Sequence, residues 1–98
     1  MPSRNKTFRF SINDRDFQVT AEPEGECRFM VRMSVLDMAG NPVLQQCNIR
    51  IGYLTGRERR WVGEFFGNRP AVSAASAKEA CRLLAAWAAG EPCFRKAA

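Results

Sequence analysis

Arginine side chains alternate with apolar side chains along several strand-like segments of this 98-residue chain, and they are its best candidates for chemistry. The clearest run, residues 27–35, places Arg28 and Arg32 between Phe29, Val31 and Met33. Neighbouring side chains of a β-strand point to opposite faces of the sheet, so this period predicts one buried and one exposed face. A guanidinium offers paired N–H donors that match phosphates and carboxylates. We therefore expect the exposed face to bind an anionic partner.

Other segments are expected to add arginines to the same surface. Residues 7–12 and 47–53 repeat the alternation, and residues 57–60 form a basic turn at one end of the predicted sheet. The predicted binding residues are Arg9, Arg28, Arg32, Arg50, Arg57, Arg59 and Arg60. Side chains on one face of a strand recur about every 6.6–7 Å, a spacing comparable to that of nucleic-acid phosphates. DNA or RNA, or an acidic protein surface, is the partner that this pattern predicts.

The charge balance agrees with an anionic partner but does not require one. The chain has 15 basic and 10 acidic residues, a net charge of +5, and most of its basic residues are arginine. Arginine contacts phosphates and stacks on bases. An open antiparallel sheet also needs a polar face, however, and arginine can fill that role with its stem covering neighbouring side chains. A plainly solvated face is the alternative to a binding surface.

Catalysis, by contrast, has little support in the sequence. The chain contains no histidine, the side chain most often used for acid–base chemistry near neutral pH. Its close carboxylates, at positions 14 and 16 and at 22, 24 and 26, fall in predicted turns, where contact with water gives no reason to expect acid–base catalysis. The glycines do not form a phosphate-binding loop before a helix. We expect no enzyme activity and no cofactor.

The four cysteines predict buried thiols rather than disulfides or a metal site. Cys27, Cys47 and Cys81 fall on positions that the periodicity assigns to the core, whereas Cys93 follows the predicted helix. No Cys-x-x-Cys pair occurs, and a zinc site without histidine would need four cysteines at unusual spacings. We therefore expect free thiols, no metal and a reducing, cytoplasmic location.

The length and composition predict a single domain over residues 1–98, with residues 1–5 and 94–98 frayed. Hydrophobic residues make up 46% of the chain, which is enough for one compact core. No apolar run reaches the roughly 18 residues that a membrane-spanning helix needs, and the amino terminus leads directly into a predicted strand. We expect no membrane association.

The fold class predicted is α+β: an antiparallel β-meander of about five strands with one C-terminal helix packed on one face. The predicted strands cover about 6–12, 16–21, 27–36, 43 or 44–54 and 59–66. The turn at residues 22–26 has proline and glycine where turns favour them. The last strand is apolar on both faces and is expected to be covered on both.

The helix is predicted over about 76–89. Ser76 and Glu79 form a capping box, in which the serine hydroxyl accepts from the Glu79 N–H and the carboxylate reaches back to the serine N–H. Gly90 and Pro92 predict its end. A stripe at helical spacing should lie on the apolar face of the sheet; its members are Ala77, Ala80, Cys81, Leu84, Trp87 and Ala88.

These features predict a small non-catalytic protein that binds nucleic acid through the arginine-bearing sheet face. The alternative is a protein-interaction module, of the mobile-element inhibitor or adaptor type, that docks on a larger complex. Its apolar centre would then be formed by Met30, Leu36, Val62 and Phe66, surrounded by arginines. A homodimer joined through an edge strand or through this apolar cluster is a third alternative.

Overall fold

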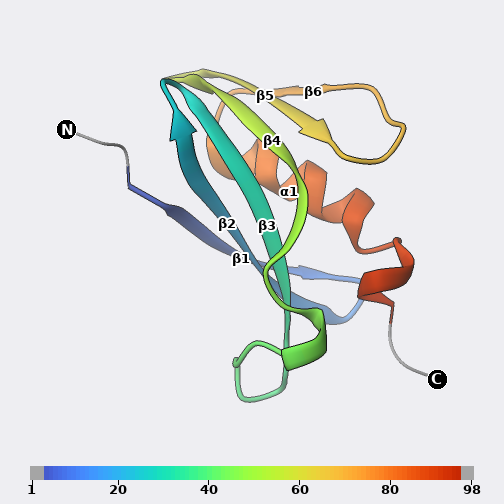
Figure 1. The fold of residues 1–98 in the computed structure, drawn as a ribbon. Helices are drawn as coiled ribbons and strands as arrows, with labels where there is room; N and C mark the ends of the chain where they lie inside the picture. Colours follow the sequence, from blue (N-terminus) through green and yellow to red (C-terminus); the bar gives the residue numbers. More distant parts are fainter. Residues whose placement is uncertain (1–3, 96–98) are drawn as a thin grey trace.

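A six-stranded antiparallel sheet and one α-helix make up the fold (Figure 1), seen in a computed structural model that describes residues 4–95. The strands pair in chain order. Their bounds are β1 (Lys6–Ile12), β2 (Arg15–Gly25), β3 (Arg28–Leu36), β4 (Ile49–Arg57), β5 (Arg60–Phe65) and β6 (Val72–Ala74). The helix is α1 (Ala77–Ala88), and the short 3-10 helices are η1 (Leu44–Gln46) and η2 (Pro92–Phe94). The predicted α+β meander with a C-terminal helix is confirmed.

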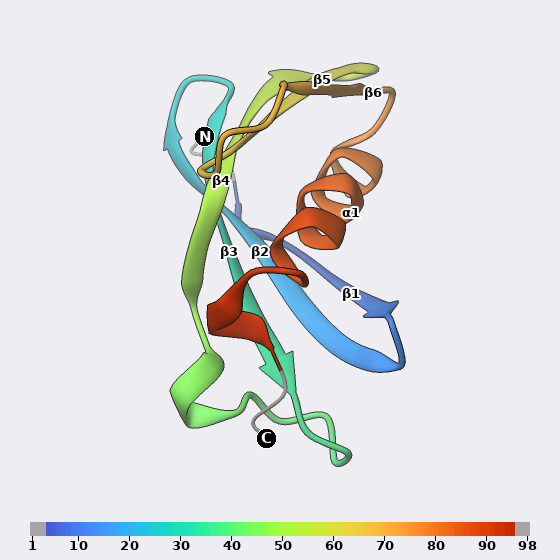
Figure 2. The same ribbon diagram turned by 90° about the vertical axis from the view of Figure 1, so that its right-hand side faces the viewer.

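The sheet is twisted and curves around α1, which lies against one of its faces (Figure 2). We call the helix side the inner face and the opposite side the outer face. The helix contacts mainly β4, β5 and β6 and reaches β1 and β2 to a smaller extent. The outer face therefore has no helix over it within residues 4–95, and the β1 end of the inner face is only partly covered.

The prediction of about five strands was one short. The additional strand, β6, pairs Trp61 with Ala74 and Gly63 with Val72 along the edge of β5. Its three residues are too few to show an alternating pattern, so only the pairing with β5 identifies them as a strand.

Two predicted boundaries also differ from the structure. β2 continues through Pro23 to Gly25, with an irregular register there, and the turn shrinks to Glu26 and Cys27. Proline is tolerated at this position because the register is already interrupted. At the other boundary, β4 begins at Ile49 rather than at residue 43 or 44, because residues 44–46 form η1.

The helix begins as predicted, but only half of the capping box forms. The Ser76 hydroxyl accepts a hydrogen bond from the Glu79 backbone N–H at 3.1 Å. The Glu79 carboxylate turns instead to Arg82, one turn along the helix. This charged hydrogen bond, rather than the cap, lowers the pKa of Glu79 below its ordinary value. No helix within residues 4–95 has the length and apolarity that crossing a membrane requires.

The inner face and the helix stripe enclose the hydrophobic core. The helix buries Ala77, Ala80, Cys81, Leu84, Ala85 and Ala88. Trp87, predicted in this stripe, is only half-buried and packs edge-on against Phe65, with ring centroids 5.9 Å apart. Close approach is possible at the centre because Gly63 has no side chain: a Cβ there would lie 3.1 Å from Cγ of Leu84.

The chain ends differ in part from the expectation of frayed residues at 1–5 and 94–98. Residues 1–3 and 96–98 lie outside the described residues, while Arg4 and Asn5 are exposed and precede β1. Phe94, in contrast, is fully buried and packs edge-on against Phe17 with ring centroids 6.3 Å apart. Its backbone carbonyl also accepts a hydrogen bond from Arg15, so the segment after the helix closes one end of the core.

The four cysteines are free, but only Cys81 is fully buried. Cys27 and Cys47, predicted in the core, are half-buried, because Cys27 lies in the β2–β3 turn with a φ of 59° and Cys47 directly follows η1. Cys93, which follows the helix, is exposed. Burial raises the pKa of the Cys81 thiol from 9.0 to about 12, and the nearby Lys6 ammonium offsets only part of that effect.

Replacing Leu84 by alanine should lower the free energy of unfolding by about 2–5 kcal/mol, because the side chain is fully buried between helix and sheet. Chemical denaturation of the purified protein measures this loss. Leu83→Ala is the matched control. Leu83 is half-buried on the same helix, so this substitution should lower the free energy of unfolding by clearly less. Equal losses for the two variants would contradict the packing described above.

Stability should fall above pH 9 because of Cys81. The pKa of the thiol is near 9.0 in the unfolded chain and about 12 in the folded one. Between these pH values the unfolded chain releases the proton and the folded chain keeps it, so rising pH lowers the free energy of unfolding. From pH 8 to pH 10 this contribution is about 1 kcal/mol. Denaturant titrations at both pH values measure how far the free energy of unfolding falls from pH 8 to pH 10. This fall should be smaller in Cys81→Ala than in the parent protein and unchanged in Cys93→Ala. A pH dependence that survives Cys81→Ala would contradict this assignment.

Candidate binding site on the outer sheet face

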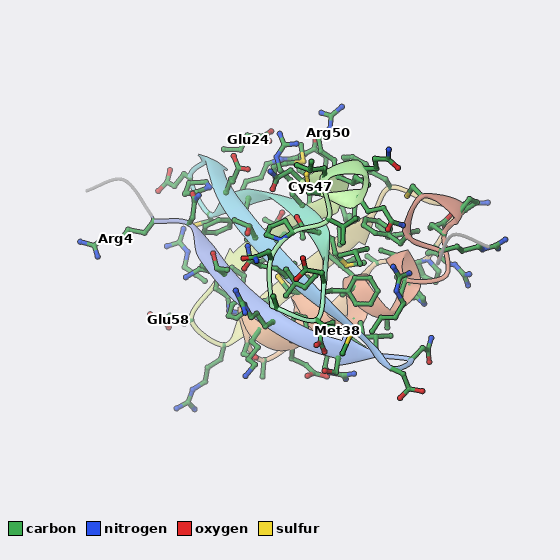
Figure 3. The ribbon with its side chains drawn as sticks, turned by 90° about the horizontal axis from the view of Figure 1, so that it is seen from below. Arg4, Glu24, Met38, Cys47, Arg50 and Glu58 are labelled. Atoms are coloured by element: carbon green, nitrogen blue, oxygen red, sulfur yellow. The ribbon has the colours of Figure 1, made fainter. Side chains whose placement is uncertain are left out.

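The strand register brings three of the predicted arginines together on the outer face. Arg32 of β3 lies directly opposite Arg50 of β4. Arg28 lies four residues from Arg32 along the same strand, about 13 Å away, and faces Thr55 of β4. Arg50 extends outward from the body of the molecule (Figure 3). The arginines alternate with buried apolar residues along these strands. Since the apolar residues face inward, the arginines lie side by side on the outer face.

A β-bulge in β4 adds aromatic side chains to this face. The register of β3 with β4 shifts at Arg32, so that Val31 pairs with Gly52 and Arg32 with Arg50, leaving Ile51 as the extra residue. Without the bulge, Tyr53 would share the inner face with Ile49 and Ile51. With it, Leu54 enters the core and Tyr53 turns outward, opposite Met30 and Glu64. A Cβ at Gly52 would lie 2.0 Å from the Glu64 carbonyl oxygen, so this position requires glycine.

The outward aromatic rings and the arginines form one contiguous group, which we call the arginine–aromatic stack: Arg28, Tyr53, Phe66 and Arg50. The Arg28 guanidinium lies 4.0 Å from the Tyr53 ring centroid. The Tyr53 and Phe66 rings meet edge to face, with centroids 5.3 Å apart. The Arg50 guanidinium lies 5.8 Å from the Phe66 centroid. Cation–π attraction therefore orients both guanidinium groups, while Phe66 stays 48% exposed.

Arg32 is less available than the alternation predicted. Its Nε donates to the Glu22 carboxylate at 2.9 Å, and its Nη1 donates to the Asn48 carbonyl at 3.4 Å. Within residues 4–95, neither Arg28 nor Arg50 takes part in a salt bridge. Arg28 and Arg50 are therefore the stronger candidates for contact with a ligand.

The expected apolar centre of the outer face is only half right. Val62 and Phe66 are 39% and 48% exposed, but Met30 and Leu36 are 6% and 8% exposed. Met30 lies between Glu22 and Tyr53 in the register, and Leu36 forms a bridge with Pro42 in the following loop. Flanking side chains and a loop cover residues that the strand period alone places in solvent.

The remaining predicted arginines do not join the arginine–aromatic stack. Arg60 shares the outer face with Val62, whereas Arg59 lies in the β4–β5 turn. Arg57 lies directly opposite Arg60 at the end of β4, and it also lines a hollow at that end of the sheet. Arg9 is on β1, two strands away from Arg32; its side chain points to the outer face, with Nη1 beside Gly40, and the residue also borders a groove next to the helix. The seven arginines thus do not form one continuous patch.

A groove of about 380 Å³ continues from the arginine–aromatic stack toward η2. Arg50, Phe66 and Phe65 line one side, and Pro92 and Cys93 line the other. The sequence gives no sign of this groove, because it depends on the chain folding back over the sheet after α1. It provides a largely apolar recess, with Glu91 among its lining residues, directly beside two side chains of the stack.

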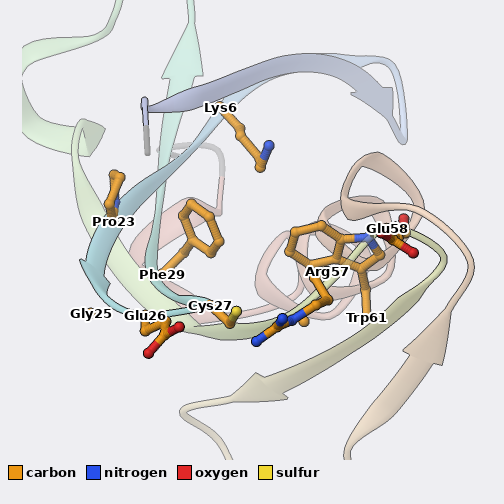
Figure 4. Close-up of a pocket in the computed structure, with 10 residues that line it drawn as sticks. Lys6, Pro23, Gly25, Glu26, Cys27, Phe29, Arg57, Glu58 and Trp61 are labelled. Atoms are coloured by element: carbon orange, nitrogen blue, oxygen red, sulfur yellow. Dashed lines mark hydrogen bonds between the residues drawn. The ribbon is translucent and has the colours of Figure 1, made fainter. Parts of the chain in front are cut away.

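The hollow at the end of the sheet has a volume of about 570 Å³, and Lys6 is one of the residues that line it. Lys6 points into it, with its ammonium 5.6 Å from the Phe29 centroid and 5.7 Å from the Trp61 centroid (Figure 4). The charged lining residues of the hollow are two basic and two acidic ones, Lys6, Arg57, Glu26 and Glu58. The hollow therefore has little preference for a charge of either sign.

The described residues offer no cluster for metal binding: within residues 4–95, no three His, Cys, Asp or Glu side chains come together. The carboxylate of Asp16 accepts a hydrogen bond from the Ser11 hydroxyl at 2.5 Å, at the end of the β1–β2 hairpin. The arginine and aromatic side chains of the outer face offer charge pairing, hydrogen bonding and stacking.

Comparisons with known proteins add no assignment. No protein-family model matches this chain, and no curated protein or solved structure shows significant similarity to it.

Proposed function

We propose that this protein is a non-catalytic nucleic-acid-binding protein that uses the outer sheet face. The observation that carries the proposal is the arginine–aromatic stack, in which two guanidinium groups are held against the rings of Tyr53 and Phe66. Arginine and exposed aromatic rings are the side chains that contact phosphates and stack on bases. The four free thiols suit the reducing cytoplasm in which such a protein would act.

The shape of the face favours a strand with unpaired bases over a regular duplex. An exposed aromatic ring binds a base only if the base is free to leave its own stack. Phe66 presents such a ring, and the groove beside it could hold a base next to the Arg50 charge. Arg28 and Arg60 both lie toward the β4–β5 turn from Phe66 and would contact successive phosphates on that side. We therefore propose single-stranded DNA or RNA as the ligand.

Replacing Arg28, Arg50 and Arg60 together by glutamine should weaken binding to a fluorescent 12-mer of oligo(dT) or oligo(U). Loss of three phosphate contacts on a single strand should also reduce the slope of log affinity against log salt by about two units. The fold should be unaffected, because these side chains are exposed. Fluorescence anisotropy between about 50 and 200 mM salt measures both quantities.

The matched control removes the same charge from the helix side, with Arg69, Lys78 and Arg82 replaced by glutamine. Arg69 lies over the Trp87 ring and Arg82 pairs with Glu79, so none of the three belongs to the outer face. Equal loss from both triple variants would indicate diffuse attraction without a defined face. If the parent protein binds neither oligonucleotide at about 50 mM salt, the proposal is wrong.

A ligand in the groove should protect Cys93 from a maleimide reagent. Cys93 is exposed and lines the groove beside Phe66, so a bound oligonucleotide should slow its labelling at least threefold. Cys47, half-buried after η1, serves as the internal control and should label at an unchanged rate. Mass spectrometry of the labelled peptides distinguishes the two thiols. An unchanged Cys93 rate under saturating ligand would place the bases elsewhere.

A protein-interaction module is the second candidate function, because Val62 and Phe66 are exposed beside the arginines. An apolar centre with aromatic and arginine neighbours is the usual composition of a binding hot spot. Such a module would be of the mobile-element inhibitor or adaptor type, and the same patch could join two copies as a homodimer. Purified protein without co-purifying nucleic acid, and a dimer lost on Phe66→Ser, would favour this reading.

A further inference from the structure

We infer that the groove between β1 and α1 binds an extended acidic peptide, which adds to the sheet as a seventh strand beside β1. This site is distinct from the outer face and does not depend on nucleic-acid binding. It would take a segment in which acidic and apolar residues alternate. The inference rests on an unpaired edge, an apolar surface left partly uncovered, and a positively charged rim.

The first observation is the unpaired edge. β1 is the first strand in the sheet order, so its side away from β2 has no strand partner within residues 4–95. Alternate residues of an antiparallel strand direct their N–H and C=O groups toward that side. In Figure 2, β1 lies at the edge of the sheet, below α1. An extended peptide can satisfy these backbone groups by adding another strand.

The second observation is that the core loses its cover at β1. Phe17 and Val19 of β2 are 1% and 0% exposed. Their partners across the sheet, Phe10 and Phe8, point to the same inner face but remain only partly buried. The apolar inner face therefore extends onto β1, beyond the part of the sheet that α1 covers. Apolar side chains on an added strand would pack beside these rings and complete the layer under α1.

The third observation is a groove of suitable size and charge. Its volume is about 500 Å³, and it is bounded by β1 on one side and by α1 on the other. The charged residues that line it are Arg9, Lys78, Glu79 and Arg82. Because Arg82 pairs with Glu79, Lys78 is the charge left on the helix side of the groove, while Arg9 projects on the outer face with its Nη1 beside Gly40. A strand that adds to β1 would place alternate side chains beside Arg9 on the outer face, where carboxylates are favoured.

The rim charge also argues against a second copy of this chain as the occupant. Antiparallel pairing of two β1 edges would bring two Arg9 side chains to the same face, close to each other. Each copy would also contribute a positively charged Lys78 to the joint groove. Like charges across such a seam are destabilising, whereas an acidic segment removes the repulsion.

The test uses a capped seven-residue peptide of alternating glutamate and valine, titrated into ¹⁵N-labelled protein. Amide signals of β1 and α1 should shift, and a lysine–valine peptide should bind at least tenfold more weakly. A glutamate–valine peptide N-methylated at alternate amides should also bind at least tenfold more weakly, because those amides cannot donate hydrogen bonds to the edge of β1. Equal binding of the N-methylated peptide would overturn strand addition. Absence of shifts at 1 mM peptide would overturn the site.

The variant Arg9→Gln with Lys78→Gln should weaken the acidic peptide about tenfold, since it removes both free rim charges. Arg28→Gln with Arg60→Gln is the control: it removes the same charge from the outer face and should leave peptide affinity unchanged. Titration with oligo(dT) separates this site from the proposed function. Shifts in β1 and α1 with the oligonucleotide but not with the peptide would show that the groove belongs to nucleic acid, and would overturn the inference.

Discussion

Burial of one helix stripe against one sheet face is the constraint on which the rest of this structure depends. Leu84 fits against Gly63, and small alanines let the helix approach the strands closely. A single helix of this length cannot cover a six-stranded twisted sheet, so it covers mainly β4 to β6. Both surfaces argued above follow from this limit. The outer face stays open for polar and aromatic side chains, and the β1 end of the inner face keeps an incomplete apolar layer.

The bulge at Ile51 adds an aromatic ring to the outer face, where that ring contacts Arg28 and Phe66. It keeps Ile51 and Leu54 in the core while Tyr53 turns outward. Tyr53 then holds Arg28 on one side and meets Phe66 on the other. A guanidinium that already lies against a ring loses less conformational freedom when it binds a ligand than a freely rotating one does. The bulge therefore sets the direction of Tyr53 and also lowers the conformational freedom that Arg28 has to lose when it binds a ligand.

The positive charge of the chain is divided between two surfaces with different recognition chemistry. Around the arginine–aromatic stack, charge accompanies exposed rings, a combination suited to phosphates and bases. Around the groove, Arg9 and Lys78 accompany an unpaired strand edge, a combination suited to peptide backbone and carboxylates. Other arginines serve the fold itself: Arg15 donates to the Phe94 carbonyl, and Arg32 pairs with Glu22. Net charge alone does not distinguish these uses.

The sequence by itself determined the features that depend on neighbours along the chain. The alternation in β1 to β3 placed Phe17 and Val31 inside and Arg28 outside, and Ser76 marked the start of the helix. These signals are local because strand period and capping act over a few residues. Only the tertiary structure decided the rest: the bulge that turns Tyr53 outward, the pairing that forms β6, and the separation of Arg9 from the other arginines. Each depends on contacts between distant segments, and no pattern within one segment can encode which partner strand it will meet.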